Sequence, residues 1–199
     1  MTVIAGLVSY GESANTYSVK KALEKAGARV VPIESRHDLT SVDKLVLPGV
    51  GGFKDAMQNL DGISSQMLDA MQQKPTLGIC LGMQILAKMG YEYGETAGFG
   101  LIEAEVTKIE VACKVPHLGW GSLIMTQPSP LFEGISESDH FYFMHSYEIS
   151  HCAEMIAQSR YCDHVFVSAV QKANVYGVQF HPEKSRDAGL KVLSNFLKL

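Results

Sequence analysis

The sequence predicts an α/β fold: a single domain over residues 1–199, with a mostly parallel, doubly wound sheet, helices on both its faces, and an added smaller antiparallel portion in the C-terminal half. Three observations predict it. Continuous apolar runs of strand length alternate with helical spacing in the N-terminal half. The second half contains short strand-like runs broken by turns, and no linker or repeat divides the chain.

In the N-terminal half, each apolar run of strand length is bounded by turn residues. A polar loop over residues 9–15 leads into a helix that carries Val19, Ala22, Leu23 and Ala26 on one face and ends at Gly27. A second helix is expected over residues 64–73. The predicted buried strands are residues 3–8, 29–33, 44–47 and 76–79.

The second half is expected to pair largely in antiparallel fashion. Its strand-like runs are residues 103–110, 141–144, 165–170 and 175–180, within two segments at 101–126 and 141–181. A final helix is predicted over residues 188–197, which closes the fold.

The composition limits which classes of protein this chain can belong to. The 199 residues are 46% hydrophobic and 19% charged, enough to bury a sizeable core, and the net charge is −4. This charge, without any basic cluster, weighs against nucleic acid or an anionic membrane as partner. No apolar run reaches the roughly 18 to 20 residues of a membrane span. We expect a cytoplasmic enzyme.

Four cysteines are spread along the chain without a Cys-x-x-Cys pair, so we expect no disulfide framework. His151, Cys152, Cys162 and His164 are candidate zinc ligands by residue type. Their spacing matches no common zinc pattern, and adjacent residues on a strand point to opposite faces. We therefore expect no metal site.

One of these cysteines lies at a sharp turn. Cys80 follows the predicted strand 76–79 and precedes a helix expected over Leu81 to Met89, with Gly90 as the stop signal. Backbone N–H groups at a helix start favour a thiolate. Gly78 and Gly82 leave room for a strained elbow like that of Gly-x-Ser-x-Gly nucleophiles. The pattern favours an activated nucleophile over a core cysteine.

Partners for this nucleophile occur at two other strand ends. His181 follows the strand 175–180, where Pro182 stops the ladder, and Glu183 is close enough to orient the imidazole. Pro48-Gly49-Val50-Gly51-Gly52 follows the strand 44–47 and can bring backbone N–H groups to a substrate oxygen. The loop lacks the lysine of a P-loop, which disfavours a nucleotide site.

These motifs resemble those of the class I, triad-type glutamine amidotransferases. The matching segments are Gly-Ile-Cys-Leu-Gly-Met-Gln at 78–84, Pro-Gly-Val-Gly at 48–51 and Gln-Phe-His-Pro-Glu-Lys-Ser at 179–185. Val-Pro-His-Leu-Gly-Trp at 115–120 and Phe-Tyr-Phe-Met-His-Ser-Tyr at 141–147 narrow the resemblance to the branch of glutaminase subunits of imidazole glycerol phosphate synthase.

The resemblance implies a role for each matching residue. Cys80 would attack the side-chain amide of glutamine, His181 would carry the proton, and Glu183 would hold His181. The oxyanion hole would come from Leu81 with Val50 or Gly51, and the substrate would be bound by Gly49, Gln84, Glu92, Ser146 and Tyr147. The partner would be a (β/α)8-barrel synthase subunit in a heterodimer, contacted by Trp120, Asn15 and Tyr142, to which ammonia is passed in histidine biosynthesis. No cofactor is implied.

The chain departs from the family pattern at three places, of which the first and third concern the partner more than the triad. The loop after Tyr10 is one residue longer, Gly90-Tyr91-Glu92 stands where Ser-Glu-Glu is common, and Gly121 replaces an asparagine. They leave open a paralogous glutaminase that feeds another synthase, such as one that aminates a surface-polysaccharide sugar. A scaffold subunit without activity is disfavoured by the intact triad residues.

Overall fold

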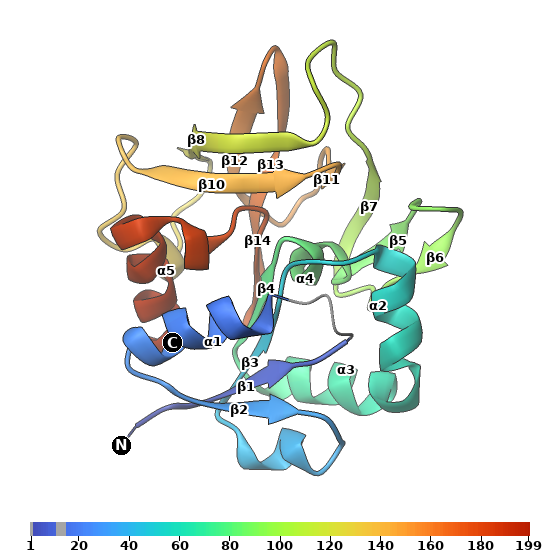
Figure 1. Ribbon diagram of the computed structural model, residues 1–199, viewed down its shortest axis with the longest axis vertical. Coiled ribbons are helices and arrows are strands. Elements are labelled where there is room, and N and C mark those ends of the chain that lie inside the picture. Colours follow the sequence, from blue (N-terminus) through green and yellow to red (C-terminus); the bar gives the residue numbers. More distant parts are fainter. Residues whose placement is uncertain (1, 11–14) are drawn as a thin grey trace.

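The computed structural model describes residues 2–10 and 15–199, and an eight-stranded sheet runs through its centre (Figure 1). The five parallel strands stand first in the spatial order, which is β2 (Arg29–Ile33), β1 (Ile4–Val8), β3 (Lys44–Leu47), β4 (Thr76–Ile79), β14 (Val175–Val178), β13 (His164–Lys172), β12 (Met155–Tyr161) and β9 (Ile124–Met125). The last three pair antiparallel and extend the same sheet.

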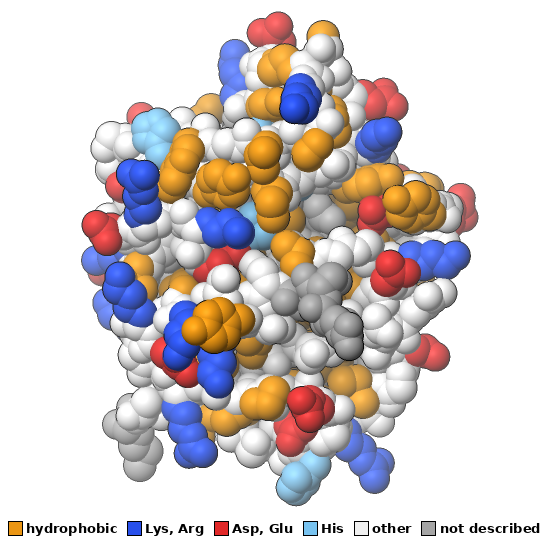
Figure 2. All heavy atoms as spheres, viewed as in Figure 1, with side chains coloured by type: hydrophobic (Ala, Val, Ile, Leu, Met, Phe, Trp, Pro, Cys, Tyr) orange, Lys and Arg blue, Asp and Glu red, His pale blue; other side chains and the backbone are white. Residues whose placement is uncertain are grey.

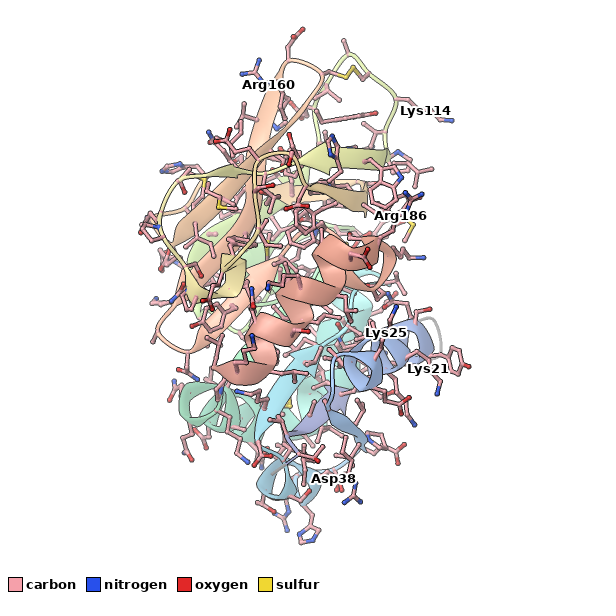
Figure 3. The ribbon with its side chains drawn as sticks, turned by 90° about the vertical axis from the view of Figure 1, so that its left-hand side faces the viewer. Lys21, Lys25, Asp38, Lys114, Arg160 and Arg186 are labelled. Atoms are coloured by element: carbon pink, nitrogen blue, oxygen red, sulfur yellow. A yellow bond between two sulfur atoms is a disulfide. The ribbon has the colours of Figure 1, made fainter. Side chains whose placement is uncertain are left out.

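Helices cover both faces of this sheet, which confirms the doubly wound prediction. One face is covered by α1 (Thr16–Lys25) and α5 (Arg186–Lys198), which contact each other (Figure 3). The other face is covered by α2 (Phe53–Leu60), α3 (Ser64–Gln73) and α4 (Leu81–Gln84). Two apolar clusters result, because alternate residues of a strand point to opposite faces: Val46 joins α1 and α5, whereas Leu45 and Leu47 join α2 and α3.

Smaller units complete the fold. A second sheet has the order β11 (Tyr147–Ile149), β7 (Ile102–Lys108), β5 (Ala87–Gly90) and β6 (Thr96–Ala97), and β8 (His117–Ser122) pairs with β10 (His140–His145) in an antiparallel ribbon. Short 3-10 helices lie at Asp38–Ser41, Asp61–Ile63, Pro130–Phe132 and Pro182–Lys184. The second sheet starts before residue 101, and its β5–β7 pair is parallel, so the added portion is larger and more mixed than the sequence predicts.

The prediction of a helix from Leu81 to Met89 is wrong beyond Gln84. The chain turns into β5 because the carbonyl groups of residues 85–88 accept hydrogen bonds from residues 98–102 rather than from the next helical turn. Phe99 N–H donates to Ile85 O at 2.8 Å, for example. Tertiary pairing overrides the helical spacing of these mostly apolar residues.

One disulfide is present, although the spread of the cysteines gave no sign of it. Cys113, before β8, is bonded to Cys162 in the turn between β12 and β13, near Lys114 in Figure 3. Cys162 is therefore no thiol ligand, and Cys152 is buried, with its pKa raised to about 11 by burial first and by the charge of Glu154 second. None of the helices in the described part of the chain is long and apolar enough to cross a membrane.

Candidate active site

Cys80 and His181 meet at one edge of the central sheet, as their positions after two strands predict. The strands β4 and β14 are parallel neighbours with Ile79 opposite Val178, and the Cys80 N–H donates to Val178 O at 2.7 Å. The carboxyl ends of parallel strands share an edge, where open α/β sheets bind their ligands. The nucleophile candidate and its base candidate are thus placed together by the sheet register.

The turn at Cys80 is strained in the manner of a nucleophile elbow. Its φ of 48° and ψ of −104° are uncommon for a residue with a side chain. A Cβ atom on Gly82 would lie 2.1 Å from Leu47 O, and one on Gly78 would lie 2.5 Å from the backbone of Gly82. Both glycines are therefore required by the close approach of β3, β4 and α4.

His181 and Glu183 form a buried pair. The imidazole Nδ1 lies 2.8 Å from Glu183 Oε1, and both side chains are shielded from solvent. The backbone of His181 is held by Tyr142 O, which accepts its N–H at 2.8 Å, and by Ser185 Oγ, which donates to its carbonyl at 2.6 Å. Its Nε2 atom is buried, with no hydrogen-bond partner of standard geometry among the described residues. This atom is placed to receive a proton.

The Asn15 side chain connects a triad candidate to the glycine loop, and Glu92 lies just beyond that loop. Asn15 donates from Nδ2 to Glu183 Oε1 and accepts the Gly49 N–H at 3.2 Å. Glu92 accepts the Phe53 N–H at the start of α2 at 2.7 Å, just beyond the loop. Asn15, which the sequence places in the partner interface, therefore contacts two other site residues. The longer loop over residues 11–14 lies outside the described residues.

The electrostatics of His181 favour its protonated form. Burial alone lowers the pKa of His181, but the charge and hydrogen bond of Cys80, followed by the hydrogen bond and charge of Glu183, outweigh burial and raise it to about 10. A buried imidazolium between a thiolate and a carboxylate is thereby stabilised. The arrangement suits a cysteine that reacts as a thiolate.

We predict that Cys80→Ala lowers the pKa of His181 well below 10. The substitution removes the largest contributions that raise the pKa and leaves the burial that lowers it. Histidine-selective NMR across a pH series measures this shift, with His117 as an internal control. A His181 signal that still titrates near pH 10 in Cys80→Ala would assign the effect to Glu183 instead.

A cavity of about 300 Å³ opens in front of Cys80. It is lined by nine residues that the sequence singles out: Gly49, Val50, Gly51, Cys80, Leu81, Gln84, Glu92, Ser146 and Tyr147. Three further lining residues are Pro116, Met144 and His145, which the sequence did not identify. The structure thus brings together the predicted oxyanion and substrate residues from four separate segments of the chain.

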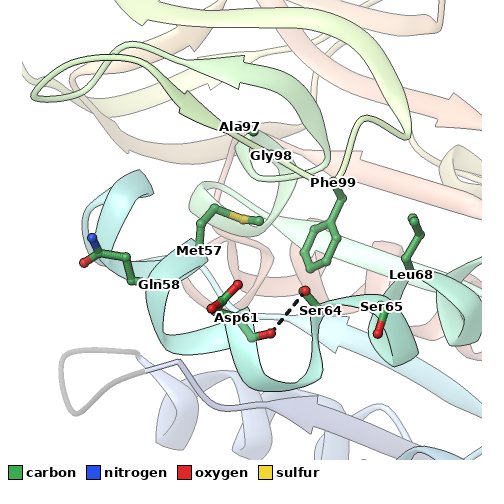
Figure 4. A pocket seen from close by; sticks show the side chains of 9 residues that line it. All are labelled: Met57, Gln58, Asp61, Ser64, Ser65, Leu68, Ala97, Gly98 and Phe99. Carbon is green, nitrogen blue, oxygen red and sulfur yellow. Dashed lines mark hydrogen bonds between the residues drawn. The ribbon is translucent and has the colours of Figure 1, made fainter.

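A wider hollow of about 510 Å³ lies elsewhere, between the α2–α3 region and the segment around Phe99 (Figure 4). Asp61 is the one ionisable residue among the nine described residues that line it, and its carbonyl accepts the Ser64 hydroxyl at 3.3 Å. Among these described residues, no nucleophile has a base beside it. The smaller cavity at Cys80 is therefore the candidate active site.

Two buried histidines support the wall of this cavity. His117 Nδ1 lies 3.1 Å from His145 Nε2, and His145 Nδ1 lies 3.0 Å from Tyr147 O. A carbonyl only accepts, so His145 carries its proton on Nδ1, and His117 must donate to His145 Nε2. Burial lowers the pKa of His117 to about 4 and, with smaller effects of His117 and His181, that of His145 to about 3. Both rings are neutral at pH 7.

This pair predicts a loss of stability in mild acid. In the unfolded chain both histidines take up a proton as the pH falls below about 6.5, whereas the folded protein does not until about pH 4 and 3. Each histidine then lowers the unfolding free energy by up to about 1.4 kcal/mol per pH unit. Urea unfolding at pH 7, 6 and 5 measures the slope. His117→Gln, which keeps a donor, should remove about one proton from the pH dependence of the unfolding free energy. An unchanged slope would contradict a neutral His117 in the folded protein.

An exposed apolar surface lies over the β8–β10 ribbon (Figure 2). Leu118, Trp120 and Ile124 are 58%, 45% and 42% exposed. The Trp120 ring contacts Tyr142 edge to face at 5.7 Å, and the Arg186 guanidinium lies 5.1 Å from its centroid. We call Leu118, Trp120, Ile124 and Tyr142 the ribbon face. It contains two of the three residues expected in the partner interface.

Comparison with known proteins identifies the family. Residues 7–199 match the model of "Glutamine amidotransferase class-I". "Imidazole glycerol phosphate synthase subunit HisH 1" of Campylobacter jejuni (strain RM1221) is 43% identical over 97% of this chain and 98% of its own length. "Imidazole glycerol phosphate synthase subunit HisH" of Aquifex aeolicus (strain VF5) is 40% identical over 96% of this chain and 94% of its own length.

Solved structures agree on the fold. A structure described as a glutamine amidotransferase superimposes with a TM-score of 0.77 at 21% identity, covering 98% of this chain and 99% of the other. PurLQS from Thermotoga maritima superimposes with a TM-score of 0.74 at 21% identity, covering 100% and 99%. The match over residues 7–199 and the relative at 43% identity confirm the predicted family: the chain belongs to the class-I glutamine amidotransferases.

Proposed function

We propose that this chain is the glutaminase subunit of imidazole glycerol phosphate synthase in histidine biosynthesis, which hydrolyses L-glutamine to glutamate and supplies ammonia to a barrel-type synthase subunit. One observation carries the chemistry: Cys80 and the glycine loop line a cavity of about 300 Å³, and the buried His181–Glu183 pair lies beside them, with His181 packed close to Gly49. The identity of 43% to relatives that are named as such subunits, over nearly the whole chain, supports the pathway. We propose residues 1–199 as one amidotransferase domain.

The proposed reaction begins with the thiol of Cys80. Its proton goes to His181 Nε2, and the sulfur forms a bond to the side-chain amide carbon of glutamine. The C–N bond then breaks as His181 returns the proton to the nitrogen, which leaves as ammonia, and a γ-glutamyl thioester remains. Water attacks the thioester, gives its proton to His181, and releases glutamate and the thiol. Glu183 holds the imidazole in orientation throughout.

The glycine loop is proposed to stabilise the oxyanion of both tetrahedral intermediates. The backbone N–H of Leu81, with that of Val50 or Gly51, is the proposed donor set, and all three residues line the cavity with Cys80. Gln84, Glu92, Ser146 and Tyr147 are proposed to bind the amino-acid end of glutamine, with Gly49 beneath the reacting atoms. The Gln84 amide nitrogen is already bonded to Tyr147 O at 2.8 Å, which leaves its oxygen to accept the substrate's ammonium group.

The partner is proposed to be a (β/α)8-barrel subunit that binds in a heterodimer. Its ammonia-dependent reaction would give imidazole glycerol phosphate and aminoimidazole carboxamide ribotide. The ribbon face is the proposed contact surface, because exposed aromatic residues beside an arginine are typical of protein interfaces. Asn15, whose side chain contacts Glu183, is proposed to lie at the same interface.

A glutaminase assay tests the proposal. The chain is assayed alone, with the histidine-pathway barrel subunit, and with that subunit and its phosphorylated ribulosyl ligand. We expect glutamate production to rise when both are added. Full activity of the isolated chain would favour a free-standing amidase, and stimulation by a different barrel synthase alone would overturn the pathway assignment while leaving the glutaminase chemistry intact.

A further inference from the structure

A buried amide beside the nucleophile takes no part in the steps above. Gln179 directly follows β14, is fully buried, and places Nε2 3.3 Å from Cys80 Sγ. We propose that Gln179 is a further catalytic residue, whose N–H group stabilises the negative charge of the Cys80 sulfur. This inference rests on the proposed glutaminase function, because it concerns the same nucleophile.

The direction of this hydrogen bond is fixed by its neighbours. Gln84 Nε2 lies 2.8 Å from Tyr147 O and 3.1 Å from Gln179 Oε1. A backbone carbonyl only accepts, so Gln84 must present its nitrogen to Tyr147 and to Gln179. Gln179 must therefore present its oxygen to Gln84, which turns its own nitrogen to the sulfur. This series of hydrogen bonds therefore ends with the Gln179 N–H group donating to Cys80 Sγ.

A second hydrogen bond of the sulfur, to the Met144 carbonyl, has the opposite effect. Met144 O lies 3.7 Å from Cys80 Sγ and accepts the thiol proton, so this contact stabilises the neutral thiol and is lost on ionisation. Gln179 is placed to offset this contact, because a hydrogen bond strengthens when its acceptor becomes charged.

Such a donor acts at two points of the proposed cycle. The sulfur carries negative charge before it attacks the amide carbon. It carries that charge again when the C–S bond of the tetrahedral intermediate breaks and the sulfur leaves with the electron pair. Loss of the donor should therefore reduce turnover more than the binding of glutamine, because the Gln84 nitrogen that donates to Gln179 also keeps its hydrogen bond to the Tyr147 carbonyl.

The test measures the sulfur directly, without glutamine. Alkylation of Cys80 by iodoacetamide is followed by peptide mass spectrometry across a pH series, in the wild-type chain and in Gln179→Met, which keeps a similar length. We expect the pH midpoint of alkylation to rise by about one unit and the rate at pH 7 to fall by about tenfold. In the complex with the barrel subunit, kcat should fall by about 10- to 100-fold with KM within about threefold.

A matched control separates this effect from damage to the core. Asn195 is another buried amide, whose Nδ2 donates to Leu131 O at 3.1 Å and to Glu133 O at 2.8 Å, away from the cavity. Asn195→Leu should lower the melting temperature without moving the alkylation midpoint. Gln179→Glu is the second variant if Gln179→Met fails to fold, and its carboxylate should move the midpoint upward further.

The outcomes distinguish this inference from the proposed function. A folded Gln179 variant with the wild-type midpoint would overturn the inference, even if its kcat were reduced. A shifted midpoint in a chain that never hydrolyses glutamine would support Gln179 as the thiolate donor and overturn the proposed function alone.

Discussion

Cys80→Ala should abolish glutamine hydrolysis, with a loss in kcat of about 10⁴-fold or more, since nucleophile, base and orienting acid act as a unit. Cys80 supplies the sulfur atom of the proposed thioester. No second free thiol is among the described residues that line the cavity. Glutamate release by the complex with the barrel subunit measures the loss.

The same variant should keep its partner. Cys80 is 5% exposed and lies below the surface, so its removal leaves the ribbon face unchanged. Synthesis driven by added ammonium should therefore persist in the Cys80→Ala complex, and co-purification with the barrel subunit should be unaffected. Glutamine-dependent turnover that survives the substitution would show that the proposed thioester mechanism is wrong.

Gly49→Ala should lower kcat by about 100-fold, the scale expected when reacting groups move by about 1 Å. An added Cβ would lie 2.8 Å from Ile79 O and 3.1 Å from both Cys80 Cβ and His181 Cε1. The methyl group would separate the nucleophile from its base or displace the glycine loop from the oxyanion position. Steady-state glutaminase kinetics with the barrel subunit and its ligand measure the effect.

Gly62→Ala is the matched control for Gly49→Ala. A Cβ at Gly62 meets nothing within 4 Å, and the residue lies in a short helical turn far from the cavity lining. It should keep wild-type kcat and gain slightly in stability, because alanine restricts the unfolded chain. If Gly49→Ala were as active as Gly62→Ala, the close packing of loop, Cys80 and His181 would not matter for turnover.

The location of the site follows from the way the central sheet changes character. The strand β14 pairs parallel with β4 on one side and antiparallel with β13 on the other. Its parallel neighbour brings Cys80 beside it, while the chain beyond its end returns past the β8–β10 ribbon, where Tyr142 O holds His181. The position of Cys80 therefore depends on the parallel pairing of β4 with β14, and that of His181 depends also on its hydrogen bond to the β8–β10 ribbon.

Much of the fold was predictable from the sequence, because strand composition and turn residues are local signals. The bounds of β2, β3, β4 and α3 agree with the predicted ranges. Cys80 and His181 could be placed at strand ends, but the parallel pairing of β14 with β4, which brings the two residues together, was decided by the tertiary structure. The segment 85–90 was predicted wrongly, since a short and mostly apolar run fits a helix or a strand equally well and distant residues decided between them.

The sequence by itself determined the family, the triad candidates and the glycine loop, since these depend on residue types at short spacing. The tertiary structure alone decided which buried polar groups surround the sulfur. Gln179 is the first residue of the sequence motif at 179–185. Its donor role, however, depends on Gln84 and on the Tyr147 carbonyl, which lie 95 and 32 positions away in the chain. Asn15 likewise joins Glu183 to the glycine loop only after folding. A hydrogen bond has a direction that depends on all of its neighbours in space, and no local pattern of residues carries that information.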